Sequence, residues 1–423
     1  MSTDPSTPSR RAFLKTTAAT AAAGLAAPAV HAGGSDVLKI GLIGCGGRGK
    51  GAAGDALKAD KNVKVTALCD IFPDFLANAY ADLKKAYGDR IDVPEDRRYS
   101  GFDGYKQLID TAGVDVVFLC TPPGFRPQHL KYAVAAGKHV FAEKPMAVDA
   151  PGVRSVLESA ELAKQKNLLC ASGFCYRYEP AKRETVARIH NGQIGDVVAV
   201  HVSYNTGELW HRGRKPEWSE MEYQVRNWYY YTWLSGDHIV EQHCHSIDKA
   251  CWVLNGQYPV AATAVGGRQV RTDPKFGNIY DHFAVVFEYA GGLKVFSNCR
   301  QMAKCDGDVN DQVFGTKGSA QLMKHTVQSG GTTWEYDGPM PSMYVEEHKA
   351  FFASLRDGKP INDMATAARS TLMAVLGRQA AYTGKRITWK QMLESKEDLL
   401  PKELAWGPNP VPPVATPGRT KFA

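Results

Sequence analysis

The chain has 423 residues, 44% of them hydrophobic and 22% charged, and a formal net charge of +7 at pH 7. This balance is typical of a soluble globular protein and excludes disordered and collagen-like classes, while the length allows roughly two or three domains with separate cores. The positive charges are too few and too dispersed to indicate nucleic-acid binding.

The first 32 residues have the pattern of an export signal. Residues 9–15 read SRRAFLK, and an alanine-rich stretch follows and ends in the small-residue sequence VHA. This segment resembles the twin-arginine consensus S-R-R-x-F-L-K, and its apolar part is too short to span a bilayer comfortably. We therefore predict a signal peptide over residues 1–32, the twin-arginine export machinery as a partner and a periplasmic location. The alternative is a disordered basic N-terminus.

Export by this route predicts a tightly held cofactor, because proteins that use it cross the membrane already folded. The cysteine pattern is compatible with folding in a reducing compartment. The nine cysteines include no C-x-x-C pair, and three of them lie inside apolar runs. We interpret them as buried thiols: Cys69, Cys120 and Cys170 are the clearest examples.

Two apolar runs, residues 37–43 and 63–68, flank a helix-compatible stretch at 50–59. The first run leads into the sequence GCGGRG, and the second ends just before Asp70. Strand, glycine-rich turn, helix, strand and acid in this order are typical of a β-α-β dinucleotide-binding unit. The alternative, a glycine-rich surface turn, leaves Asp70 unexplained.

The residues of this unit have separate predicted roles. Gly44 allows the tight turn, Gly46 lets the backbone approach the pyrophosphate, and Gly49 lets the helix pack on the strand. The pyrophosphate is expected at the helix N-terminus, beside Gly47 and Arg48. Asp70, about 20 residues after Gly49, is placed to accept hydrogen bonds from the ribose hydroxyls of NAD and to repel the 2′-phosphate of NADP. NAD is therefore favoured over NADP.

Two further apolar runs, residues 114–119 and 139–142, continue the predicted parallel sheet. Each run is followed by a turn, and ligands of open α/β sheets bind at the carboxyl ends of the strands. Pro145 blocks an immediate helix, so that Lys144 projects into the cleft rather than along a surface helix. The cofactor-binding residues expected from these turns and the next helix are Thr121, Pro122, His129, Glu143 and Lys144.

At these positions the chain resembles the Gfo/Idh/MocA family, which is named for glucose-fructose oxidoreductase, inositol dehydrogenase and a rhizopine-catabolism protein. The matching residues are Gly44, Gly46, Gly49, Asp70, Thr121-Pro122-Pro123, Glu143-Lys144-Pro145, the segment NGQIG at 191–195 and His245-Ser246-Ile247-Asp248. The resemblance implies that Lys144 touches both nicotinamide and substrate. It also implies a homo-oligomer, since family members commonly pair through their sheets.

The resemblance further implies an α/β fold with a Rossmann domain at 33–148 and a C-terminal α/β domain at 149–406. The second domain is expected to contain a large, mostly antiparallel open sheet, a substrate site and a dimerisation surface. A helix at 365–382 is expected to pack back on the Rossmann domain. The proline-rich tail at 407–423 is expected to be disordered or wrapped on a neighbour. The predicted strands of the sheet are residues 197–204, 260–265, 281–289, 292–299 and 309–314.

The catalytic candidates lie in residues 237–248. Glu241, His245 and Asp248 have the spacing i, i+4 and i+7, so we expect them to share one helix face. His245 is the candidate general base because imidazole titrates near neutral pH, with Glu241 and Lys144 orienting it and the substrate. The family pattern is commonly D-x-G-x-H-x-x-D. Glu241 therefore replaces an aspartate, which implies either a different substrate position or a changed reaction.

The histidines of the same segment leave an alternative open. His238, His243 and His245, with Glu241, offer metal-ligating groups. Histidines two residues apart cannot share a helix face, and His238 and His243 as hydrogen-bonded packing residues are the simpler interpretation. We predict no metal.

Residues 205–236 contain four of the eight tryptophans together with several tyrosines and arginines. Aromatic faces interleaved with planar polar groups suit sugar rings, although an oligomer interface has a similar composition. Arg177 is expected to bind a carboxylated or a neutral substrate. The predicted substrate-binding residues are Tyr176, Arg177, Trp228, Trp233 and Asp248.

Together these features predict an enzyme that transfers hydride between tightly bound NAD and a ring hydroxyl or ketone of a sugar, glycoside or cyclic polyol. Because free NAD is scarce outside the cytoplasm, two redox-neutral alternatives stay open: exchange between two sugars, or cleavage of a glycoside through transient oxidation. A non-catalytic sugar- or NAD-binding protein is a third alternative, since a fold alone does not decide function.

Overall fold

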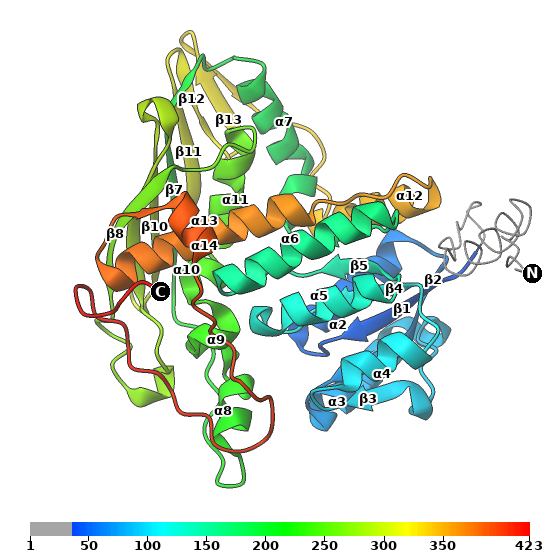
Figure 1. The fold of residues 1–423 in the computed structure, drawn as a ribbon. Coiled ribbons are helices and arrows are strands. Elements are labelled where there is room, and N and C mark those ends of the chain that lie inside the picture. The colour runs from blue at the N-terminus through cyan, green and yellow to red at the C-terminus, as the bar shows by residue number, and fades with distance from the viewer. Residues whose placement is uncertain (1–35) are drawn as a thin grey trace, which may run out of the picture.

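The structure is a computed structural model that describes residues 36–423. The predicted signal peptide at 1–32 lies outside the described residues. Two sheets form two adjoining domains, and the long helices α6 and α13 run between them (Figure 1). None of the helices in the described range is long and apolar enough to span a membrane.

The first domain contains a six-stranded parallel sheet in the order β3-β2-β1-β4-β5-β6. This is the strand order of a dinucleotide-binding Rossmann fold. Because helices cover both faces, the central strands are apolar throughout: VVFL in β4 and HVFA in β5 are buried at every position. The strands are β1 (Leu38–Ile43), β2 (Val63–Asp70), β3 (Arg98–Ser100), β4 (Val116–Leu119), β5 (His139–Ala142) and β6 (Cys170–Ser172).

The sheet continues beyond residue 148, where the sequence analysis places the end of the Rossmann domain. The chain leaves β5, forms α6 and returns as β6, which pairs in parallel with β5. Its helices are α2 (Gly47–Ala59), α3 (Pro73–Tyr87), α4 (Gly104–Thr111), α5 (Arg126–Ala135) and α6 (Ala150–Gln165). A late helix, α12 (Met343–Arg356), also packs on α2. Its Phe351 and Phe352 enter the core of this domain, and Arg356 pairs with Asp60 at 2.8 Å.

The second domain contains a nine-stranded sheet in the order β14-β13-β12-β11-β7-β10-β9-β8-β15. Only β7 and β10 pair in parallel, so the predicted mostly antiparallel sheet is confirmed. All five predicted strand runs are strands. Strands β12 to β15 were not predicted, because they are short and largely polar. The strands are β7 (Val197–Thr206), β8 (Ala261–Gly267), β9 (His282–Glu288), β10 (Lys294–Gln301), β11 (Asp308–Gly315), β12 (Gly318–Gln321), β13 (Thr326–Ser329), β14 (Thr332–Glu335) and β15 (Ile387–Thr388).

The predicted helix at 365–382 is α13 (Met364–Thr383). It packs on α6 of the Rossmann domain and also on β8 and β9 of the second sheet, so it joins the two domains. Its buried Arg378 donates hydrogen bonds to the Val148 and Gly236 carbonyls at 2.7 and 3.1 Å. The other helices of this domain are α7 (Pro180–His190), α8 (Glu220–Arg226), α9 (Thr232–Ser235), α10 (His238–Glu241), α11 (Cys244–Val253) and α14 (Trp389–Glu394).

The tail at 407–423, for which disorder was one expectation, is ordered in the structure. It runs along its own chain beside α8 and α9 (Figure 1). Tyr280 donates to the Ala415 carbonyl at 2.9 Å, and the backbone N–H of Gly418 donates to Thr383 at 3.0 Å. Prolines keep the segment extended, and their neighbours' carbonyls accept hydrogen bonds from groups on the body of the protein.

Candidate functional site

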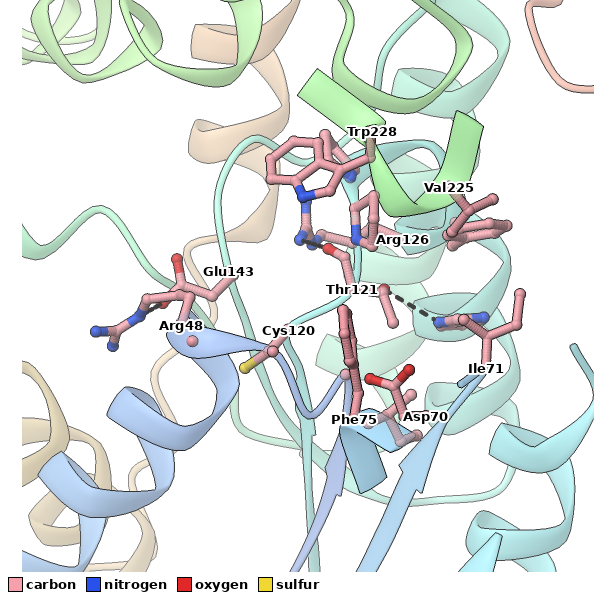
Figure 2. Close-up of a pocket in the computed structure, with 18 of the residues that line it drawn as sticks. Arg48, Asp70, Ile71, Phe75, Cys120, Thr121, Arg126, Glu143, Val225 and Trp228 are labelled. Atoms are coloured by element: carbon pink, nitrogen blue, oxygen red, sulfur yellow. Dashed lines mark hydrogen bonds and ion pairs between the residues drawn. The ribbon is translucent and has the colours of Figure 1, made fainter. Parts of the chain in front are cut away.

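A cavity of about 400 Å³ lies between the carboxyl ends of the parallel strands and residues 205–236. Figure 2 shows Asp70 and Phe75 beside the strand ends, with Thr121, Arg126 and Trp228 along the next part of the wall. Most of the predicted cofactor-binding residues line this cavity. They are Gly44, Gly46, Gly47, Arg48, Asp70, Thr121, Pro122, His129, Glu143 and Lys144.

The glycine-rich turn between β1 and α2 has the shape of a pyrophosphate cradle. Gly44 has a φ of 96°, a conformation in which other residues are strained. A Cβ on Gly49 would lie 1.8 Å from the Gly44 carbonyl oxygen, so Gly49 allows α2 to pack on the turn. At Gly46 and Gly47 a Cβ would meet no atom within 4 Å. These two positions border the open space at the start of α2 that a pyrophosphate requires.

Asp70 ends β2 and is almost fully buried. Its carboxylate accepts backbone hydrogen bonds from Cys45 at 2.6 Å and Phe72 at 2.9 Å. Burial raises the pKa of Asp70 to about 6, so the group is ionised at neutral pH. A carboxylate oxygen has more than one lone pair, and Asp70 therefore still offers acceptors to ribose hydroxyls. The glycine cradle and this acidic group together fit NAD.

One side chain that was not predicted to belong to the site connects the turns after β4 and β5. Arg126, buried at the start of α5, donates to the carbonyls of Thr121 and Pro145. No local sequence pattern distinguishes this arginine from a surface one. His129, one turn later, is neutral because burial and then the Arg126 cation lower its pKa to about 3.

Arg48 and Glu143 lie next to each other in the cavity wall (Figure 2). The Arg48 Nε lies 2.5 Å from the Glu143 carboxylate, and its guanidinium lies 4.7 Å from the centre of the Tyr344 ring. Glu143 therefore fixes a positive charge at the start of α2. Phe75, Trp210, Tyr229 and Tyr344, which the sequence analysis did not select individually, also line the cavity.

The predicted catalytic residues Lys144, Glu241 and His245 all line the same cavity. The Lys144 ammonium donates to the Glu241 backbone carbonyl at 2.7 Å. Within the described part of the chain, Glu241 Oε1 and His245 Nδ1 are buried and have no hydrogen-bond partner. Such atoms carry an energetic cost unless a ligand or water satisfies them. They therefore mark where a polar substrate fits.

Burial and neighbouring groups shift the pKa values of all three residues. Burial raises the pKa of Glu241 to about 7, against the opposing effect of the Lys144 cation. Burial, and then Lys144, lower the pKa of His245 well below its usual value. Although burial alone lowers the pKa of Lys144, Cys244 and Glu241 raise it above its usual value. Lys144 is therefore charged and His245 neutral.

Glu241, His245 and Asp248 do not share one helix face, so that prediction was wrong. Helix α10 ends at Glu241, and α11 begins at Cys244. The chain turns between the two helices, at Gln242, where φ is −115° and ψ is −55°. The turn, and not helical periodicity, brings Glu241 and His245 to the cavity.

Asp248 lies behind the cavity wall. Its carboxylate accepts two hydrogen bonds from Arg177, at 2.8 and 2.9 Å, and one from Ser370 at 2.8 Å. Half-buried Arg177 and buried Asp248 thus form an ion pair, and neither lines the cavity. Tyr176 lies outside the lining too, with its ring centre 5.1 Å from that of His245.

Of the two tryptophans predicted to bind substrate, the structure places only Trp228 in the cavity lining. It stacks on Tyr229 with ring centroids 3.9 Å apart. Trp233 is buried, and its indole N–H donates to Gln224 at 2.8 Å. Trp233 therefore supports the cavity wall from behind.

The remaining histidines of the segment have protein partners. His238 Nδ1 lies 2.9 Å from the Asp237 carboxylate, and His243 Nε2 lies 2.7 Å from the Ser297 hydroxyl. Burial lowers the pKa of His243 to about 3. Residues 36–423 contain no group of three or more His, Cys, Asp or Glu residues that could hold a metal ion.

Comparisons with known proteins agree with the two-domain fold. Residues 38–174 match the family model of an oxidoreductase family with an NAD-binding Rossmann fold, and residues 183–321 match the GFO/IDH/MocA C-terminal domain. An inositol 2-dehydrogenase of Pseudomonas fluorescens is 29% identical over 337 residues, which cover 76% of this chain and 87% of that protein. The corresponding enzyme of Pseudomonas syringae is 30% identical, with 67% and 74% covered.

Solved structures share this fold. The scyllo-inositol dehydrogenase of Lactobacillus casei, solved with NAD(H) and scyllo-inositol, has a TM-score of 0.65 at 19% identity, covering 84% of this chain and all of that one. The aldose-aldose oxidoreductase of Caulobacter crescentus has a TM-score of 0.64 at 20% identity, with 83% and 99% covered. The two matching domain models and the glycine cradle with Asp70 lead to one conclusion: the chain belongs to the Gfo/Idh/MocA family of oxidoreductases, and its cofactor is NAD.

Proposed function

We propose that this enzyme transfers hydride between NAD and a ring hydroxyl of a cyclic polyol or sugar. The observation that carries the proposal is the cluster that lines the nucleotide cavity near the Lys144 ammonium. There, Glu241 Oε1 and His245 Nδ1 are buried and have no hydrogen-bond partner among residues 36–423. The similarity to inositol 2-dehydrogenases supports a cyclic polyol as the substrate class.

The roles of these residues follow from their protonation states. NAD, when bound, supplies the hydride acceptor. His245 is neutral and accepts the hydroxyl proton as the C–H bond breaks. Lys144 donates one hydrogen bond to the Glu241 carbonyl. Its remaining N–H groups are available to donate to the substrate oxygen. Glu241, with a pKa of about 7, exchanges a proton with the substrate or with water.

The wall opposite the strand ends suits a ring with hydroxyl edges. Trp228, Tyr229 and Trp210 line the cavity there, and the rings of Trp210 and Tyr229 meet edge to face with centroids 5.1 Å apart. Such aromatic surfaces pack against the C–H faces of sugars and cyclic polyols, while the acid–base cluster meets the hydroxyl edge.

The test uses Lys144→Met and His245→Ala with a panel of inositols, aldoses and glycosides. We expect either change to lower kcat by a factor of about 10² to 10⁴, the usual contribution of an essential acid–base group, while NADH still binds, as titrated by fluorescence. Lys131→Met, at an exposed position on α5, is the matched control and should retain full activity. Near-normal turnover in both site variants would refute the proposal.

A redox-neutral cycle is the second candidate. Residues 205–236 cover the nucleotide cavity and contribute Val225, Trp228 and Tyr229 to its lining, an arrangement that favours a cofactor retained between turnovers. In such a cycle the same NAD is reduced and reoxidised, with two sugars exchanged or a glycoside cleaved. Product analysis without added NAD distinguishes the three outcomes: a net redox change, an exchange between sugars, or hydrolysis.

We also propose export to the periplasm and assembly into a homo-oligomer. The SRRAFLK sequence at residues 9–15 supports export through the twin-arginine pathway. Cell fractionation tests this: we expect the mature protein in the periplasm and the Arg10→Lys/Arg11→Lys variant in the cytoplasm. Periplasmic recovery of both forms would contradict that route. The oligomer is supported by an exposed apolar face of the nine-stranded sheet, which carries Phe296, Val265 and Phe314.

A further inference from the structure

Trp406, the residue immediately before the C-terminal tail, lies at the rim of the nucleotide cavity. The Trp406 ring stacks against Phe72, with centroids 5.6 Å apart, and lies 4.8 Å from the Phe102 ring. Phe72 and Phe102 both line the cavity, next to Asp70 and Phe75. Because Asp70 marks the place of the ribose, Trp406 supports the wall around the adenosine half of NAD.

Helix α8 and the turn after it form a roof over the same half of the cavity. Val225 and Trp228 of this roof line the cavity. Between them, Arg226 forms two hydrogen bonds to Asp74 of α3, at 3.0 and 3.1 Å. The Arg226 guanidinium also lies 4.0 Å from the centre of the Phe72 ring and 5.4 Å from that of Phe75, so Arg226 attaches the roof directly to the Rossmann domain.

The tail attaches to the roof immediately after Trp406. The Met221 N–H donates to the Gly407 carbonyl at 3.1 Å. Gln224 and Asn409 form a reciprocal pair: the Gln224 amide donates to the Asn409 carbonyl at 2.5 Å, and the Asn409 amide donates to Gln224 Oε1 at 2.8 Å. Gln224 also accepts from Trp233, so the pair continues into the buried wall of the cavity.

Residues 406–409 thus contact both sides of the cavity at once. Trp406 packs against Phe72 and Phe102 at the rim of the Rossmann domain. Gly407 and Asn409 form hydrogen bonds with the roof. The following tail is anchored separately at Ala415 and Gly418. Residues 406–409 and the end of the chain are therefore held by different contacts.

We propose that residues 406–409 are a strap that retains bound NAD, with Trp406 and Asn409 acting as positioning residues of the cofactor site. For the roof to lift, Arg226 must leave Asp74 and the strap must release Gln224 and Met221. For the adenosine wall to loosen, Trp406 must leave Phe72 and Phe102. NAD dissociation then requires both events. The strap rests on the cofactor assignment and does not depend on which substrate is oxidised.

The test measures NADH dissociation from the full-length mature protein by stopped-flow displacement with excess NAD. We expect Trp406→Ala to raise the dissociation rate by at least about tenfold and to raise the KM for NAD, with kcat unchanged or increased. Trp406→Phe should retain slow dissociation because it keeps an aromatic ring against the two phenylalanines. Asn409→Ala should accelerate release by a smaller factor, and combining it with Trp406→Ala should accelerate release further.

Val411→Ala, at an exposed tail position, is the matched control and should release NADH at the wild-type rate. Thermal unfolding without cofactor separates cofactor retention from folding: the strap predicts nearly equal midpoints for the apo forms of all variants. The proposal that residues 406–409 retain NAD would be refuted if Trp406→Ala and the double variant released NADH at rates within twofold of wild type. Because NADH release is measured without substrate, that outcome would leave the proposed oxidation of a ring hydroxyl standing.

Discussion

Glu241 and His245 have shifted pKa values because both are buried beside the charged Lys144. Burial penalises the charged form of each group, which raises the pKa of the carboxyl to about 7 and lowers that of the imidazole. The Lys144 cation opposes the first shift and reinforces the second. Near neutral pH the cluster therefore combines a neutral base, a fixed cation and a carboxyl group that is partly ionised.

This arrangement predicts a pH dependence assigned to Glu241. The group is protonated below pH 7 and ionised above it, so kcat/KM for hydroxyl oxidation should rise through about pH 7 and then level off. Glu241→Gln should remove this inflection and lower the rate by about 10² to 10⁴. Glu241→Asp should keep an inflection but lose about 100-fold in rate, because the shorter side chain displaces the carboxylate.

Initial-rate profiles between about pH 5 and 9 provide the measurement, with exposed Glu95 (Glu95→Gln) as the control. An unchanged inflection in Glu241→Gln would show that another group is responsible for it.

At the scale of elements, the turn from β1 into α2 is the most constrained part of the cofactor site. Helix α2 starts at Gly47 and approaches the turn so closely that no side chain fits at Gly49. The packing of α2 by α12, which arrives nearly 300 residues later in the chain, fixes the helix from its other side. The helix cannot move away without disturbing both contacts.

Gly49→Ala should therefore destabilise the protein and abolish NAD binding. The added Cβ would lie 1.8 Å from the Gly44 carbonyl oxygen, and overpacking of this kind costs about 1–3 kcal/mol or more. In Gly51→Ala, in the same helix, the added Cβ meets only the Arg48 guanidinium, at 3.3 Å from Nη1, and no backbone atom. This substitution should be neutral or stabilising by about 0.5–1 kcal/mol. Urea unfolding and NADH titration of both variants measure the difference, and equal behaviour would contradict the packing argument.

At the scale of the whole molecule, the large sheet is covered unevenly. Helices α10, α11 and α13 pack on one face, and the side chains of β9 alternate between buried and half-buried along its whole length. The opposite face carries Phe296, Val265 and Phe314, all exposed. The strand pairing places these side chains on the same face: Phe296 is opposite Val286, and Val265 is opposite Ala284. An apolar sheet face of this kind is typical of a protein interface.

We expect this face to bury itself against a second copy of the chain. Phe296→Asp combined with Val265→Asp should convert a dimer or larger assembly into a monomer, because the introduced carboxylates would be desolvated in the interface. Val270→Asp, at an exposed position in the loop after β8, is the control and should leave the assembly unchanged. Sedimentation velocity measures the outcome. A monomeric wild-type protein would contradict the expectation.

The cofactor half of the site was predictable from the sequence. The glycine turn, Asp70, Thr121 and Lys144 each lie at or just after the carboxyl end of a strand, and parallel strands bring their carboxyl ends to one edge of the sheet. Local order along the chain therefore determines which side chains meet. The same reasoning placed five strands of the second sheet, since apolar runs and strands coincide wherever one face is buried.

Tertiary structure decided the rest. Arg177 and Asp248 satisfy each other across 71 positions of sequence, and Trp406 reaches Phe72 from the opposite end of the chain. Glu241 and His245 reach the same cavity through a break between helices that periodicity did not indicate. A residue's type shows what it can bind, but its partners depend on which distant segments fold against it. Burial by those segments also sets the pKa values on which the proposed chemistry depends.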